Sequence, residues 1–153
     1  MDTTKLETME HIDHVRTNLS IIIKELINRQ NNHDQSKLHS PEVEIFHEYT
    51  PKLKQLTYNS KEYKDCLKNM GVAIEHHYQN NRHHPEYFDN GIKGMHLIDL
   101  IEMFCDWVAT TKRHNNKDVN RSLAINKIRF NYSDDLMEIF KNSVELLDLK
   151  KQH

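Results

Sequence analysis

Helix-breaking residues are scarce in this chain, whose 153 residues include only three glycines and three prolines. Long segments between them repeat apolar side chains every three or four residues, which is the spacing of one face of an α-helix. The pattern therefore predicts an all-α fold, a single compact bundle of about six helices. No linker, repeat or low-complexity tract interrupts it, so we expect one domain over residues 1–153.

The periodicity and the helix-end signals place the six helices. The expected ranges are 4–31, 41–51, 61–80, 95–113, 118–130 and a last helix from residue 133 onward. Ser60 or Asn59 is expected to cap the third helix, and Ser40 with Pro41 to open the second. The first helix carries an apolar stripe of Ile12, Val15, Leu19, Ile22, Ile23 and Leu26. On the fourth, we expect Leu97, Ile98, Ile101, Phe104 and Val108 to be buried.

Composition and charge narrow the function classes. Twenty-one Lys and Arg against 23 Asp and Glu give a net charge of −2, which predicts no bulk attraction to nucleic acid or to an anionic membrane. The sequence contains no run of 18 apolar residues, so we expect no membrane span. The polar first residues and the two distant cysteines, Cys66 and Cys105, favour a cytoplasmic protein with reduced thiols. The sequence leaves a homodimer open.

Twelve histidines are the unusual feature, and the sharpest pattern is His33-Asp34 followed by Ser36-Lys37. Adjacent imidazole and carboxylate groups suit a divalent metal, and Mn, Fe, Ni, Zn and Mg all remain open. The alternative is a polar turn that caps the next segment. His11, at the edge of the apolar stripe, is the best upstream partner, although it could equally be a core-edge histidine bonded to a backbone carbonyl.

A second cluster, His76-His77 and His83-His84, places four histidines within nine residues. His77 continues the apolar stripe of its helix, whereas His76 points about 100° away. An inward imidazole needs a hydrogen bond or a metal, because a buried polar group without a partner is costly. Arg82 is a candidate phosphate clamp. The alternative for this segment is a solvated polar loop.

The fourth helix supplies carboxylates at Asp99, Glu102 and Asp106, which share one face. A solvated acidic stripe is the plainer interpretation of this spacing. Asp106 lies between Cys105 and Trp107. A carboxylate in so crowded a setting is expected to be paired with a cation, so Asp106 is the candidate for the ligand that completes the metal site. Asp99 and Glu102 would then support the ligands, or bind a second metal.

The order His11, His33-Asp34, His77, His83-His84, Asp106 resembles the HD-domain metal-dependent phosphohydrolase superfamily, with Ser36 where the stretch His-Asp-x-Gly-Lys has glycine. Nearly the entire chain is also similar to a family of small bacterial and phage proteins classified only as a domain of unknown function. The matching segments include 33–42, 76–86 and 102–107. These resemblances imply an HD-like helical fold in a bacterial cell or a phage-infected host cell.

The leading hypothesis is a metal-dependent phosphohydrolase that uses a metal-activated water on a nucleotide or another small phosphorylated molecule. The expected metal ligands are His11, His33, Asp34, His77, His84 and Asp106. The residues expected to act in catalysis or to hold phosphate are Asp34, Lys37, Arg82 and His83. Two alternatives are a non-catalytic metal- or nucleotide-binding module that acts through a protein partner, and an HD-like iron oxygenase.

Overall fold

The computed structural model describes residues 3–56, 60–113 and 118–148, and the chain divides into two units, 1–33 and 34–153. In the described residues the regular structure consists of seven α-helices and three short 3₁₀ helices, with no strand. The predicted all-α fold is therefore confirmed, with seven helices in place of about six. None of the described helices combines the length and the apolar character needed to cross a bilayer.

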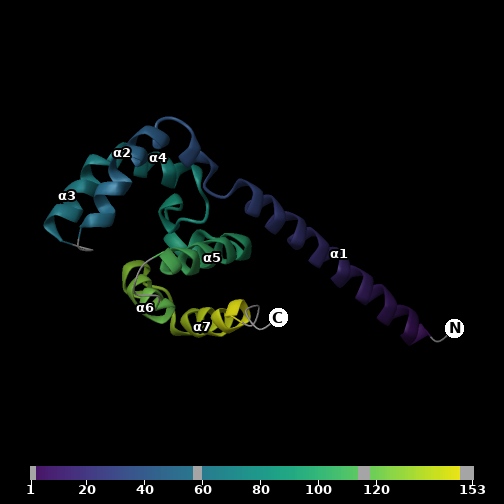
Figure 1. Cartoon of the computed structure of the whole chain (residues 1–153). Helices are drawn as coiled ribbons and strands as arrows, with labels where there is room; N and C mark the ends of the chain where they lie inside the picture. The colour runs from purple at the N-terminus through teal and green to yellow at the C-terminus, as the bar shows by residue number, and fades with distance from the viewer. Residues whose placement is uncertain (1–2, 57–59, 114–117, 149–153) are drawn as a thin grey trace. The chain divides into compact units, whose positions relative to one another are not determined.

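The first unit is a single continuous helix, α1 (Thr3–Asn32), whose 30 residues extend over about 45 Å (Figure 1). The stripe of apolar residues lies along it as predicted, but no side chain of α1 is buried. Local contacts support the helix. Ion pairs join Arg16 to Asp13 and Arg29 to Glu25, at 3.0 and 2.9 Å, and several hydroxyl groups donate to the carbonyl four residues earlier.

The second unit begins with η1 (Gln35–Leu38), α2 (Glu42–Gln55), α3 (Lys61–Asn69) and α4 (Gly71–Asn80). Pro51 lies inside α2, which continues past the expected end, and Pro41 rather than Ser40 occupies the N-cap. Ser60 caps α3 as predicted, because its hydroxyl accepts a hydrogen bond from the amide of Tyr63. α2 packs against both η1 and α4.

The single helix expected over 61–80 is instead two helices, α3 and α4, which meet at Met70. The amide of Met70 bonds back to the carbonyls of Cys66 and Leu67 and closes the last turn of α3. Gly71 follows directly, and glycine is a poor helix former that does little to carry a helix through such a junction. The break therefore lies where the local sequence favours a continuous helix least.

The rest of the second unit contains η2 (Pro85–Tyr87), η3 (Gly91–Gly94), α5 (Leu97–Arg113), α6 (Val119–Phe130) and α7 (Asp134–Asp148). Its last three helices follow one another in the C-terminal part of the chain (Figure 1), and side chains from all three form the hydrophobic core. The buried members of this core are Met103, Phe104, Val108, Leu123, Tyr132 and Phe140. The Tyr132 hydroxyl donates to the carbonyl of Leu123 at 2.7 Å, and burial raises the pKa of this hydroxyl to about 12.

The faces of α5 differ from the expected ones. Ile98, Phe104 and Val108 are buried as predicted, but Leu97 and Ile101 are exposed. The acidic face turns inward: Asp99 is fully buried, and the Glu102 side chain is only 10% exposed. A solvated acidic stripe is therefore excluded for these two residues. Their charges meet cationic or imidazole partners from other elements, which the periodicity of one helix cannot show.

We expect Gly94→Ala to destabilise the protein, because a Cβ atom there would approach Phe88 Cβ to 2.8 Å and the loop would have to shift. The expected loss is about 1–3 kcal/mol in the free energy of unfolding, measured by urea titration. Gly71→Ala is the matched control, since nothing lies within 4 Å of its added Cβ. It should leave stability unchanged or raise it by up to about 1 kcal/mol. Equal losses in both variants would contradict this account.

Candidate metal centre

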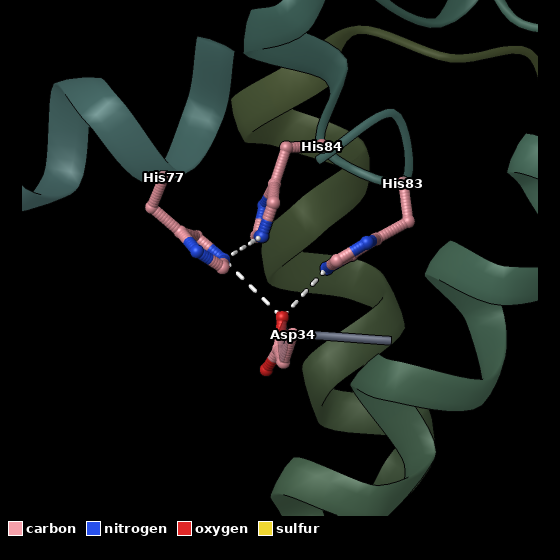
Figure 2. A group of neighbouring side chains, drawn as sticks. All are labelled: Asp34, His77, His83 and His84. Carbon is pink, nitrogen blue, oxygen red and sulfur yellow. Dashed lines mark hydrogen bonds and ion pairs between the residues drawn. The ribbon is translucent and has the colours of Figure 1, made fainter. Parts of the chain in front are cut away.

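Four side chains from three segments of the second unit point toward a common centre (Figure 2). Asp34 precedes η1, His77 belongs to α4, and His83 and His84 lie in the loop that follows α4. Their ligand atoms all lie within 4.8 Å of one another. The structure thus unites residues from both histidine-containing patterns of the sequence.

Three distances in this cluster match the edges of a metal coordination shell. His77 Nε2 lies 2.9 Å from His84 Nε2 and 3.3 Å from Asp34 Oδ1, and His83 Nε2 lies 3.4 Å from the same oxygen. Two donors that each sit about 2.1 Å from one ion, in tetrahedral to octahedral geometry, stand about 3.0–3.4 Å apart. Three imidazoles and one carboxylate also form a chemically suitable donor set for Zn, Fe, Mn or Ni. The residues present therefore fit a divalent metal.

Contacts to Nδ1, on the side of the ring away from the cluster, fix the orientation of His77. Its Nδ1 lies 2.8 Å from Glu42 Oε2, and both side chains are buried. Asn81 Nδ2 also lies near this nitrogen, but its two hydrogens have acceptors in the Ser36 hydroxyl and the His77 carbonyl. His77 Nδ1–H therefore donates to Glu42, which leaves the lone pair on Nε2 directed at the cluster.

Glu42 is fully buried and binds two imidazoles at once. Its second oxygen, Oε1, lies 2.7 Å from His76 Nδ1, so the carboxylate spans neighbouring histidines of α4. The sequence does not single out this residue, because Glu42 and Glu44 occupy the same first helical turn and both favour the helix dipole. No local signal distinguishes the two; only the packing of α2 on α4 does. The structure also shows that His77, rather than the half-exposed His76, faces the cluster.

His83 repeats this arrangement with a carboxylate from a different helix. Its Nδ1 lies 3.2 Å from Glu102 Oε1 on α5, while Nε2 faces Asp34. An imidazole held by a carboxylate on one nitrogen and directed at a centre with the other is the usual support of a metal-binding histidine. The structure therefore places His83, expected to act in catalysis, among the donors, and Glu102 in the supporting position.

His84 is held in the neutral form that metal binding requires. Burial, together with the neighbouring His83 and His77, lowers its pKa to about 2. An imidazole must be unprotonated to donate a lone pair, so protons do not compete for the His84 imidazole at neutral pH. His84 Nε2 is thus available to a metal throughout the physiological range.

Asp34 adopts a left-handed backbone conformation, with φ 57° and ψ 15°. Aspartate tolerates this region better than most residues, although it costs a non-glycine residue about 1–2 kcal/mol. The turn directs Oδ1 toward His77 and His83, and Lys37 Nζ binds the other oxygen at 2.6 Å. Lys37 is 41% exposed along its side chain, so a cation lies at the edge of the cluster.

Arg82 is engaged differently from the expected phosphate clamp. Its guanidinium donates to both oxygens of the buried Asp99, at 3.2 and 3.0 Å, and lies over the rings of Tyr87 and Phe88. This bidentate pair anchors the loop that carries His83 and His84 to the start of α5. In the structure Arg82 is thus a positioning residue, and a direct contact with substrate stays a prediction.

Three further predicted ligands, Asp106, His33 and His11, do not belong to the group of four side chains around Asp34. A carboxylate oxygen of Asp106 lies within 4.8 Å of one of Asp34, at the margin of the cluster. His33 ends the first unit, directly before Asp34 in the chain. His11 is exposed on α1, and 21 residues of continuous helix, about 31 Å, separate it from Asn32 at the helix end. A role for His11 as a metal ligand stays a prediction.

Comparison with known proteins identifies the chain only at the level of a family. A model for a family of unknown function, DUF5662, matches residues 1–146. No curated protein and no solved structure matches.

The low pKa of His84 predicts how stability depends on pH. In the unfolded chain this imidazole binds a proton below about pH 6.5, whereas in the folded chain it stays neutral down to about pH 2. The unfolded state therefore gains protons first, and stability falls as the pH is lowered from 7 to 5, by on the order of 2 kcal/mol from this group. We expect His84→Gln to remove that part of the loss in urea unfolding measured with a chelator present.

His14→Gln is the control for this measurement, because His14 is exposed on α1. This variant should retain the pH dependence of the wild type. An unchanged dependence in His84→Gln would show that the neutral imidazole does not contribute in the way described.

Proposed function

The chain belongs to the DUF5662 family, and from its own site we propose that it is a metal-dependent phosphohydrolase that acts on a small phosphorylated molecule. The observation that carries the proposal is the paired arrangement of His77 with Glu42 and His83 with Glu102. Each carboxylate binds Nδ1 and leaves Nε2 directed at the centre shared with Asp34. Two such arrangements converging on one carboxylate support a metal site over a polar turn or a solvated loop.

The proposed ligand set comprises Asp34, His77, His83 and His84, and a carboxylate oxygen of Asp106 lies within 4.8 Å of one of Asp34. A bound divalent cation supplies Lewis acidity, which activates water and offsets the negative charge of a phosphoryl group. Lys37, at the edge of the cluster, is the cation we assign to a phosphate oxygen. It can reach outward while Asp34 keeps its contacts with the histidines.

In the proposed reaction, water attacks phosphorus as the phosphate ester P–O bond breaks. The products are inorganic phosphate and an alcohol that takes up a proton. The resemblance of His33-Asp34 to HD-domain enzymes supports this chemistry. The setting we propose is the cytoplasm of a bacterial cell or a phage-infected host, where the free thiols Cys66 and Cys105 stay reduced.

The test of this proposal is metal content together with turnover. After incubation with Mn, Fe, Ni, Zn or Mg, we expect the wild-type protein to retain about one or two equivalents by mass spectrometry. We expect it to release phosphate from members of a panel of phosphate monoesters. Asp34→Asn should lose most of the metal and the activity, because it removes the anionic ligand. Asp65→Asn, an exposed aspartate on α3, should behave as wild type.

The outcomes separate the alternatives. Metal retention without turnover would overturn the hydrolase assignment and favour a binding module. Oxygen consumption with reducible iron would instead identify an oxygenase. Absence of metal from the wild type after every incubation would exclude all metal-dependent functions of this cluster.

The role of Glu42 gives a separate prediction. Glu42→Gln keeps the shape of the side chain but removes the charge that holds the two imidazoles, so we expect metal affinity to fall by about 10–100-fold, measured by calorimetry. Glu44→Gln, the exposed neighbour in the same helical turn, should leave the affinity unchanged. Circular dichroism shows whether each variant is folded. Equal affinities in folded Glu42→Gln and wild type would contradict the positioning role.

A further inference from the structure

A cavity of about 440 Å³ lies beside the metal centre, between α5 and α6. His84 and Asp106 line one part of it, so it opens onto the cluster that contains His84. Its size falls within the range of small-molecule pockets. A molecule bound here would place one end against the proposed catalytic centre.

An aromatic wall forms one side of the cavity. The rings of Trp107 on α5 and Phe130 on α6 are nearly parallel, with centroids 5.9 Å apart and planes inclined by 6°. Trp107 also packs against Tyr132 and Phe140, which fix its ring from the core side. A half-buried, rigid aromatic wall favours a flat ring as its ligand, because stacking is gained at little entropic cost.

Neutral polar groups face the same cavity. Thr110 on α5, with Ser122 and Asn126 on α6, contributes hydroxyl and amide groups to its lining. Within the part of the chain that the structure describes, their side chains form no hydrogen bond to protein groups. These donors and acceptors suit a ligand with ring nitrogens, exocyclic groups and sugar hydroxyls.

Charge and length restrict the ligand further. Three carboxylates and two guanidinium groups line the cavity, and Arg129 is paired with Glu86, so the walls do not favour a polyanion. Arg129 also contacts Tyr78 of α4, which places the C-terminal end of α6 at the end near His84. Arg121 lies eight residues earlier, about 12 Å along the helix. This distance along α6 is long enough for an uncharged ring and a sugar, in a ligand whose single phosphate lies at the end near His84.

We propose that this cavity binds the organic group of the substrate, and that this group is a heteroaromatic base on a sugar, as in a nucleoside monophosphate. The inference rests on the proposed function for the placement of the phosphate at the metal centre. The contacts with the base and sugar depend on the cavity alone, and they can be measured without metal.

Trp107 is the only tryptophan of the chain, so its fluorescence reports on this wall directly. We would titrate metal-free protein with adenosine, guanosine, cytidine and uridine, and with ribose 5-phosphate as the ligand without a base. At least one nucleoside should quench the signal saturably, whereas ribose 5-phosphate should not. Thr110→Phe, which fills the cavity, should weaken that binding by at least about tenfold. Ala109→Phe, at an exposed adjacent position outside the lining, should not.

A second pair of variants tests the side of the cavity that α6 forms. Ser122→Phe lines the cavity and Ala124→Phe does not, although both lie on α6. If Thr110→Phe alters the circular dichroism spectrum and is therefore not folded as the wild type, the comparison of Ser122→Phe with Ala124→Phe tests nucleoside binding in its place. Absence of nucleoside binding, or equal binding in the filled variants, would overturn the inference and leave the metal-dependent activity standing. Nucleoside binding by a protein that retains no metal would instead support the cavity and overturn the proposed function.

Discussion

The buried carboxylate of Glu42 is the interaction on which the site depends. A carboxylate removed from water is costly unless charges or hydrogen bonds surround it, and here the imidazoles of His76 and His77 supply them. The pair therefore draws the start of α2 onto α4 and fixes the nitrogen that His77 presents. A hydrogen bond between residues 35 positions apart thus determines both how the helices pack and which atom faces the cluster.

The other donors depend on similar long-range contacts. The loop with His83 and His84 is held at one point by Glu102 and at another by the pair of Arg82 and Asp99. Because the adjacent loop residues Arg82 and His83 are both tied to α5, the imidazoles can lie close together in a buried setting. The low pKa of His84 follows from that crowding, since burial and neighbouring imidazoles both disfavour its charged form.

Helix α5 connects three parts of the molecule. Met103 and Phe104 belong to the hydrophobic core, Glu102 supports His83, and Trp107 lines the cavity beside the cluster. The core that stabilises the three C-terminal helices therefore also sets the position of the loop histidines and of the aromatic wall. Loss of core packing would disturb the candidate centre and the cavity together, because α5 carries residues of both.

The sequence by itself determined the all-α class, the course of α5 and α6, and the position of His77 on the apolar stripe of its helix, because periodicity and end signals are local properties of a helix. It also identified histidine and aspartate as the chemically unusual groups. Only the tertiary structure selected Glu42 over Glu44, placed His83 beside Asp34 and His77, and paired Arg82 with Asp99. Those outcomes depend on which distant segments meet, and a local pattern carries no information about contacts made across the packed unit.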